Sequence, residues 1–288
     1  MAVGLAGAPA DAVGEIAGLL GPGGVVVLSG AGLSTESGIP DYRGPTGLAR
    51  RASPMTYQTF TGSAAARRRY WARSHLGWRH IAQAAPNHGH HAVAELDRRG
   101  LLTGIITQNV DGLHQAAGAS AVTELHGSLH RVICLSCGQR TPRTDLDRRL
   151  TAANPGWAPA AGRAAPDGDA ELTAAQVAGF RVADCAACGG LLMPDVVFFG
   201  ENVPRPRVDD CYALVERSAA LLVLGSSLTV MSGFRFVRRA ARHGVPVAIV
   251  NQGVTRGDDH AILRIGLPLG AALAGLVHDI ADLAERAS

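Results

Sequence analysis

Two cysteine pairs are the clearest candidates for a site of chemistry in this sequence. Two residues separate Cys134 from Cys137, and two residues separate Cys185 from Cys188. This spacing lets both thiolates of a pair reach one tetrahedral ion, and the glycine after each second cysteine allows the tight turn that the geometry needs. Redox-active thiols are the alternative, but such motifs usually occur singly. We therefore predict one structural Zn²⁺, held by four thiolates and closed to substrate.

A glycine turn near the N-terminus is a second candidate. The apolar run Val25 to Leu28 ends at Ser29 and is followed by Gly30-Ala31-Gly32-Leu33-Ser34. Glycines let a backbone approach a phosphate closely, and a following helix N-terminus would favour the negative charge. The turn is not a GxGxxG fingerprint, because Thr35 stands in the place of the last glycine, and it is not a Walker loop, because the chain has no lysine. A nucleotide-binding turn and a plain tight turn both stay open at this point.

Apolar runs and helical patterns alternate along the chain, and they must position these residues. The predicted strands are residues 25–28, 105–107, 221–224 and 245–250. The predicted helices are residues 12–20, 88–99, 209–219, 234–242 and 271–285. Strands that alternate with helices indicate a parallel sheet covered on both faces, whose ligands bind at the carboxyl ends of the strands. The polar clusters of this sequence follow those strand ends.

Two stretches do not fit the alternation, and we interpret both as insertions. We predict an α/β fold with a Rossmann-like parallel sheet domain formed by residues 1–128 and 196–288. A helical insertion at about 45–95 and a small zinc-binding module at 129–195 interrupt it. Cys211 lies inside a helical pattern and is predicted to be a small core residue.

Composition excludes several classes of protein. All 27 basic residues of the 288 are arginine, so no Schiff-base or phosphate-loop lysine is possible. A net charge of +3 and an aromatic content of 5% give no support to nucleic-acid binding. We find no apolar run long enough for a membrane span and no signal peptide pattern, so we expect a cytoplasmic protein that does not bind membranes. We also expect a monomer.

Six motifs, in one order, together carry a family resemblance. They are GAGLSTESGIPDYR at 30–43, TQNVDGLH at 107–114, ELHGS at 124–128, PDVVFFGE at 194–201, GSSLTV at 225–230 and NQG at 251–253. With the paired cysteines between the third and fourth motifs, the chain strongly resembles the sirtuins, the NAD-dependent protein deacylases, from about residue 12 to 285. Segments 69–78, 165–169 and 233–236 resemble most the class II branch.

The resemblance implies a reaction that consumes NAD as a co-substrate. The acyl oxygen of an acyl-lysine attacks C1′ of the nicotinamide ribose, nicotinamide leaves, and a histidine activates a ribose hydroxyl for attack on the acyl carbon. The products are lysine, nicotinamide and O-acyl-ADP-ribose. By motif match, His126 is the base, and Asn109 contacts the ribose and orders water there. Imidazole suits this role because it titrates near neutrality. His114 is predicted to be a packing or hydrogen-bonding residue near the site.

The resemblance also implies the residues that bind NAD. Asp111, with the backbone of Val110 and Ile39, matches the nicotinamide site, and Gln108 matches a ribose contact. A turn or helix cap is the alternative for Gln108 and Asn109. Diphosphate contacts are expected from Gly30, Ala31, Gly32, Ser34, Gly225, Ser226 and Ser227. Adenosine contacts are expected from Asn251, Gln252, Gly253 and Leu269. The remaining predicted contacts are Asp41, Tyr42, which stands where many sirtuins have Phe, and Arg43, whose alternative is a surface salt bridge.

Acyl-lysine proteins or peptides are the implied partners, bound as an added strand between two segments of the chain. The first segment is Val197, Phe198, Phe199, Gly200 and Glu201, and the second is a loop at 230–234. Tyr70 and Arg73 share one helix face and resemble the Tyr-x-x-Arg pair with which desuccinylating sirtuins hold an acyl carboxylate. A solvated basic face is the alternative, because Arg67, Arg68 and Arg69 adjoin the pair.

Two other functions stay open at the level of sequence. One is transfer of ADP-ribose onto a protein, which shares the release of nicotinamide. The other is a non-catalytic zinc-knuckle interaction protein that senses NAD.

Overall fold

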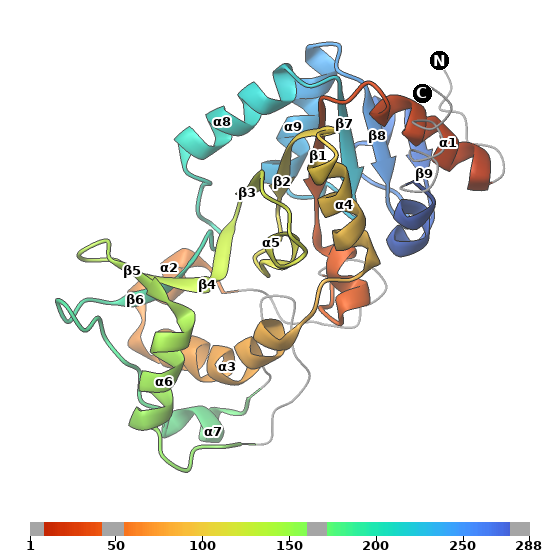
Figure 1. Cartoon of the computed structure of the whole chain (residues 1–288). Helices are drawn as coiled ribbons and strands as arrows, with labels where there is room; N and C mark the ends of the chain where they lie inside the picture. The colour runs from red at the N-terminus through yellow and green to blue at the C-terminus, as the bar shows by residue number, and fades with distance from the viewer. Residues whose placement is uncertain (1–8, 42–54, 160–171, 277–288) are drawn as a thin grey trace.

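The structure is a computed structural model, and it describes residues 9–41, 55–159 and 172–276. Figure 1 shows two parts, a larger one built on a sheet and a smaller one beside it that contains α3, α6 and α7. Tyr42 and Arg43 lie outside the described residues, and so does segment 165–169.

A six-stranded parallel sheet forms the centre of the larger part (Figure 1). Its order is β3-β2-β1-β7-β8-β9, and each neighbouring pair runs parallel. Counted along the chain this is the 3-2-1-4-5-6 order of the Rossmann fold, in which the order reverses beside the first strand. The strands are β1 (Val25–Ser29), β2 (Leu102–Thr107), β3 (Val122–Glu124), β7 (Ala220–Leu224), β8 (Val247–Val250) and β9 (Leu263–Ile265).

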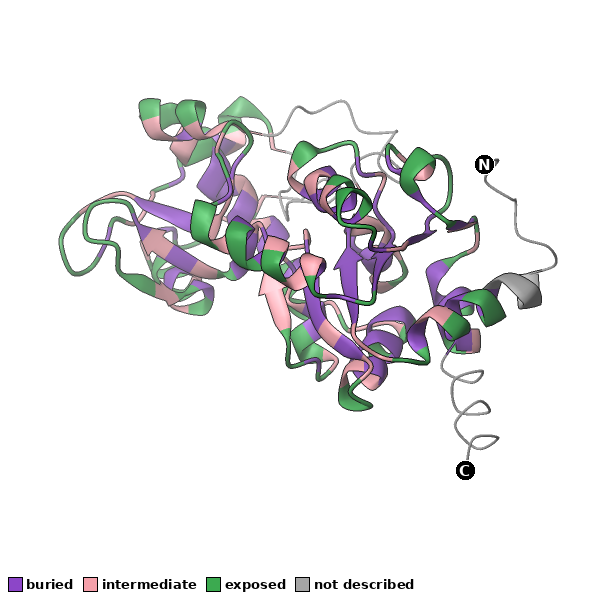
Figure 2. Cartoon of the chain, turned by 90° about the horizontal axis from the view of Figure 1, so that it is seen from above, coloured by how far each residue is buried: buried purple, intermediate pink, exposed green. Residues whose placement is uncertain are grey.

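Helices cover both faces of this sheet. They are α1 (Pro9–Leu20), α4 (His88–Arg98), α5 (Leu113–Ala116), α8 (Arg205–Glu216) and α9 (Met231–Arg242), with short 3-10 helices at Ala31–Ser37 and Asp258–His260 and helical residues at 269–276. In β1, Val25 and Val27 belong to one core with α1, α4 and 269–276, whereas Val26 and Leu28 belong to the opposite core with α8 and α9. Figure 2 shows the strands buried between helices whose outer faces are exposed. The predicted α/β fold is confirmed.

The smaller part is built on a three-stranded antiparallel sheet of order β5-β4-β6. Its elements are β4 (Gly127–Cys134), β5 (Arg140–Pro142), β6 (Leu192–Val196), α2 (Tyr57–Gly62), α3 (Ala64–Gln83), α6 (Arg143–Ala153) and α7 (Ala174–Ala178). Phe60 and Trp71 pack with Val132, Leu150 and Phe180 in one core. The helical insertion and the cysteine-rich segment therefore fold against each other.

The structure differs from several sequence predictions at element boundaries. α8 begins at Arg205 rather than residue 209, because Pro204 and Pro206 suit the first turn of a helix, which lacks internal N–H partners. α9 begins at Met231, so the predicted loop at 230–234 is mostly helix. The sequence patterns predict neither β3 and β9 of the parallel sheet nor the three strands of the smaller sheet. The proposed domain boundaries at 128/129 and 195/196 fall within β4 and β6, and the division into two domains stays a prediction.

Among the helices of the described residues, none has the length and apolar character needed to span a bilayer.

Candidate active site

A cavity of about 1050 Å³ opens at the carboxyl ends of β1, β2, β7 and β8. It lies where the strand order reverses beside β1, which is where ligands bind in open parallel sheets. Every described residue that the sequence assigned to NAD or to catalysis lines this cavity. The order of the strands thus brings together motifs that are far apart in the chain.

Two glycine turns meet at the floor of the cavity. The N–H of Gly32 donates to the carbonyl of Gly225 at 2.9 Å, and the N–H of Gly30 donates to Leu224 at 3.0 Å. A Cβ on Gly32 would lie 2.8 Å from the Gly225 oxygen, and one on Gly225 would lie 2.5 Å from the nitrogen of Leu33. Gly225 also has φ of +61°, which disfavours other residues. Only glycine permits this close backbone approach, and the small residues of both turns line the cavity.

A chain of hydrogen bonds orients the polar residues after β2. The side-chain amide of Asn109 donates to the Gly30 carbonyl at 3.1 Å and to Ser34 Oγ at 3.0 Å. Ser34 in turn donates to Asp111 Oδ2 at 2.6 Å, and the N–H of Leu113 donates to Asp111 Oδ1 at 3.0 Å. Both carboxylate oxygens of the buried Asp111 are therefore anchored. The Asn109 nitrogen is used for support, which leaves its oxygen for other contacts.

Gln108 connects the ends of three elements. Its side-chain amide donates to Ser226 Oγ at 2.8 Å and to the Ser29 carbonyl at 3.3 Å, so it bridges the ends of β1 and β7. Its backbone carbonyl lies 2.9 Å from Nδ1 of His126. A carbonyl can only accept a hydrogen bond, so Nδ1 carries the proton and Nε2 is the basic atom of the neutral ring.

His126 lies just before β4 and lines the cavity. Burial lowers the pKa of its imidazole, and the positive charges of Arg207 and Arg235 lower it further, against the raising effect of the Gln108 carbonyl. The neutral ring, with Nε2 unprotonated, is therefore favoured near neutral pH. Such a ring can accept a proton from a hydroxyl group.

The segment Val197 to Glu201 forms another wall of the cavity. The N–H of Val197 donates to the His126 carbonyl at 2.8 Å, and Phe199 forms a parallel bridge with Thr56. Phe199 is 40% exposed, whereas Phe198 is 7% exposed. Burial raises the pKa of the Glu201 carboxyl, although it accepts a hydrogen bond from the N–H of Phe198 at 2.8 Å. The segment thus passes the base after β6 and closes in a turn, where the N–H of Glu201 donates to the Phe198 carbonyl at 3.0 Å.

Tyr70 and Arg73 differ in their relation to the cavity. Tyr70 lines it, is 4% exposed, and packs against Phe60 and Phe198 with ring centroids 5.3 and 5.4 Å apart. Arg73 lies one turn later on α3 and is half-buried. The described residues that line the cavity do not include Arg73.

The residues predicted for adenosine lie after β8 and at the start of the last described helix. The side-chain amide of Asn251 donates to the carbonyls of Gln252 and Gly253 at 3.1 and 3.2 Å and so shapes the turn. Leu269 contacts Gly225, where an added Cβ would lie 2.7 Å from its Cδ1. The four residues predicted for adenosine, Asn251, Gln252, Gly253 and Leu269, all line the cavity.

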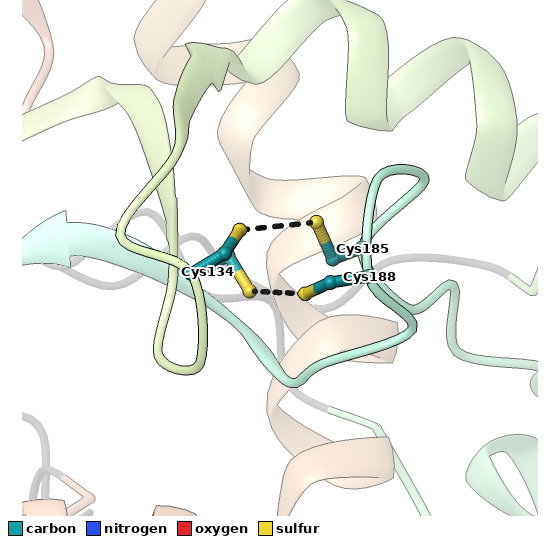
Figure 3. Close-up of side chains that lie close together, drawn as sticks. Cys134, Cys185 and Cys188 are labelled. Carbon is teal, nitrogen blue, oxygen red and sulfur yellow. Dashed lines mark hydrogen bonds between the residues drawn. The ribbon is translucent and has the colours of Figure 1, made fainter.

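The four cysteines form a cluster in the smaller part, apart from the cavity. Cys134 ends β4, and Cys185 and Cys188 point toward it from the loop before β6 (Figure 3). The four Sγ atoms lie within 4.8 Å of one another, with Cys134 and Cys188 at 3.5 Å and Cys137 and Cys185 at 3.9 Å. Thiolates arranged tetrahedrally at about 2.3 Å from Zn²⁺ are about 3.8 Å apart, so this donor set fits zinc. The backbone N–H of Cys137 lowers the pKa of the Cys134 thiol, whereas the neighbouring thiols raise the pKa of Cys188.

Known proteins share both the sequence and this architecture. A sequence model of the Sir2 family matches residues 30–232. The chain belongs to the Sir2 family. It is 65% identical over 258 residues to a Streptomyces coelicolor protein named NAD-dependent protein deacetylase 1, with 90% of this chain and 86% of the relative covered.

Two solved Sir2 structures resemble the fold of this sirtuin. One, of a Sir2 protein with a deacetylated p53 peptide and 3′-O-acetyl ADP ribose, has TM-score 0.75 and 30% identity and covers 92% of this chain and 97% of that one. The other, of a Sir2 protein with a p53 peptide and NAD⁺, has TM-score 0.73 and 29% identity and covers the same shares, 92% and 97%.

The cavity of this sirtuin also has lining residues that the sequence did not assign individually. Thr35 and Glu36 follow the glycine turn, and Ser232 and Arg235 lie in the first turns of α9. No local motif marks the last two, because their position depends on where α9 begins and how it packs against β7 and β8.

Proposed function

We propose that this sirtuin is an NAD-dependent protein deacetylase, which moves the acetyl group of an acetyl-lysine to ADP-ribose and releases nicotinamide. One observation carries the proposal most directly. The unprotonated Nε2 of His126 lies in the same cavity as the two glycine turns and the segment that begins at Val197. A general base, a nucleotide-binding site and a peptide-binding segment therefore occur together. The names of the relatives agree with this function.

NAD is the substrate that fits the cavity from end to end. We assign the diphosphate to the two glycine turns, Gly30 to Ser34 and Gly225 to Ser227, because glycines and small side chains let a phosphate approach the backbone closely. Adenosine then lies toward Asn251 and Leu269, and the nicotinamide end lies toward Asp111 and Asn109. Asp111 is held by Ser34 and by the N–H of Leu113, so it can receive a carboxamide donor without rearranging.

His126 then acts as general base in the second half of the reaction. A ribose hydroxyl loses its proton to Nε2, and the oxygen forms its new bond to the acyl carbon. Water then adds to the same carbon, the bond from this carbon to the lysine nitrogen breaks, and lysine leaves as the protonated amine. The Gln108 carbonyl keeps the required tautomer, since it holds the proton on Nδ1. The peptide lies along Val197 to Glu201 as an added strand, a mode of binding that depends on the backbone and tolerates many sequences.

One Zn²⁺ held by the four cysteines supplies stability rather than catalysis, because four thiolates leave no open coordination position. The four thiols must stay reduced to bind it, which agrees with a reducing compartment such as the cytoplasm. We also propose that the protein acts as a monomer, and light scattering during size-exclusion chromatography tests this.

The decisive experiment is a reaction with adenine-labelled NAD and an acetyl-lysine peptide, followed by mass spectrometry. We expect free lysine peptide, nicotinamide and O-acetyl-ADP-ribose in equal amounts. His126→Ala should lower the rate by about 10²–10⁴-fold, and His243→Ala, at an exposed site at the end of α9, is the matched control. Label transferred to protein would favour ADP-ribosyl transfer. Binding of NAD without turnover would favour a non-catalytic NAD-sensing module.

We further propose that this sirtuin belongs to the class II branch and that Tyr70 and Arg73 bind the carboxylate of an acidic acyl group. The position of Tyr70 in the cavity wall supports this, and Arg73 follows it on the same helix face. Arg73→Ala should lower turnover of succinyl- and glutaryl-lysine by about tenfold or more and leave acetyl-lysine unchanged. The exposed Arg69 provides the control variant Arg69→Ala. Equal rates on all acyl groups, unchanged in Arg73→Ala, would contradict it.

A further inference from the structure

Ser232 makes a direct contact with the basic atom of His126. Its Oγ lies 2.8 Å from Nε2, although the two residues are 106 positions apart in the chain. The Gln108 carbonyl holds the ring proton on Nδ1, so Nε2 offers only a lone pair. Ser232 must therefore be the donor, and its hydroxyl group occupies the atom that would accept the proton of a substrate.

The start of α9 holds Ser232 in this position. Val230 is the N-cap of the helix and Ser232 is its second residue. Gly233 packs directly on the side chain of Gln108, where an added Cβ would lie 2.7 Å from Cδ, while Phe234 and Phe236 are buried in the core. Gln108 thus contacts His126 through its backbone carbonyl, and its side chain contacts Gly233, the residue after Ser232. The hydroxyl and the imidazole are fixed relative to the same residue.

Ser232 is half-buried and lines the cavity, so the contact faces the space in which a ribose would bind. His126 has hydrogen-bond partners at both ring nitrogens in the free protein, and this determines the direction in which Nε2 points. Loss of the Ser232 hydroxyl would remove one of these two hydrogen bonds and leave the ring oriented through Nδ1 alone.

We propose that Ser232 is a positioning residue, which directs Nε2 of His126 into the cavity until a substrate hydroxyl replaces it. This inference rests on the proposed deacetylase function. In this exchange a substrate hydroxyl replaces the Ser232 hydroxyl as the hydrogen-bond donor to Nε2 of His126, and no covalent bond changes. Chemistry follows as above, when the substrate hydroxyl gives its proton to Nε2.

Ser232→Ala separates this role from a general structural one. Nicotinamide release precedes the base step, so exchange of labelled nicotinamide into NAD should be unchanged, while kcat for deacetylation should fall by about three- to tenfold. A hydrogen bond donated to Nε2 favours the neutral ring, so its loss raises the pKa of His126. The acid limb of the kcat/KM profile should therefore move to higher pH by about half a unit to one unit.

Two further variants and one direct measurement complete the test. Ser232→Thr keeps the hydroxyl group and should restore both kcat and the acid limb, and Ser120→Ala, at an exposed serine after α5, should match the wild type. Nitrogen NMR of the free protein should report His126 as the Nδ1–H tautomer, with an Nε2 signal that shifts in Ser232→Ala.

Each outcome has a defined meaning. An unchanged acid limb and unchanged kcat in Ser232→Ala would overturn the inference. A parallel loss of nicotinamide exchange would also overturn it, because that result indicates a displaced start of α9. Absence of turnover in the wild type would instead refute the deacetylase function. In that case the NMR signal of His126 still decides whether Ser232 holds the ring.

Discussion

The buried pair His90 and His114 should make the protein less stable as the pH falls, and His114→Gln should remove about half of that effect. His114 is 2% exposed, and its Nε2 lies 2.8 Å from Ser29 Oγ. Ser29 donates its own proton to Thr107, so the imidazole is the donor, and Nδ1 has no hydrogen-bond partner among the described residues. A proton added at Nδ1 would create a buried charge without a partner. Gln keeps the donor to Ser29 and does not titrate.

The magnitude follows from the two pKa values. Burial lowers the pKa of His114 to about 4, with a contribution from His90, whose own pKa burial also lowers to about 4. In the unfolded chain both titrate at the ordinary value of 6.5. Above that value neither state binds the proton. Below it the unfolded state binds protons that the folded state does not, so stability falls until about pH 4. Each histidine then costs about 2 kcal/mol of unfolding free energy between about pH 7.5 and pH 5.

Urea unfolding followed by tryptophan fluorescence and circular dichroism measures this at several pH values. The wild type should lose about 4 kcal/mol through this pair between about pH 7.5 and pH 5, and His114→Gln should lose about 2 kcal/mol less. Protonation of other groups, including the zinc ligands, affects both proteins equally and cancels in the difference. If both proteins lose stability in parallel, the buried neutral state assigned to His114 is wrong.

Three further predictions concern the metal, the glycine turns and the composition. Cys188→Ser should abolish the one equivalent of zinc measured by elemental analysis and unfold the smaller part in circular dichroism; full zinc content would contradict a four-thiolate site. Gly32→Ala should weaken NAD binding about tenfold or more in calorimetry, because its Cβ would lie 2.8 Å from the Gly225 oxygen, and unchanged affinity would exclude this turn as the phosphate site. Mass spectrometry of the protein incubated with acyl donors should find acylation only at the N-terminal amine, hydroxyl or thiol groups, because the chain has no lysine.

Much of the fold was predictable because it depends on local patterns. The valine and leucine runs of β1 and β7 are buried on both faces, and such runs indicate strands of a covered parallel sheet. Short strands such as β3 and β9, with three residues each, carry too few residues for a pattern and were missed. Helix starts were placed too late, since the first turns of α8 and α9 contain proline, serine and glycine rather than apolar residues.

The sequence by itself determined the four-cysteine ligand set, the glycine identity of the turns and the neutral amides after β2, because spacing and residue type decide these within a few positions. Cys211, fully buried, is a core residue as predicted, and His114 is a buried hydrogen-bonding residue as predicted. Only the tertiary structure decided which distant residues meet. Ser232 reaches His126 because the strand order places the ends of β2, β1 and β7 along one edge of the sheet, and Phe199 pairs with Thr56 because the helical insertion folds against the segment that follows β6. Contacts of this kind depend on packing between elements, which no local pattern encodes.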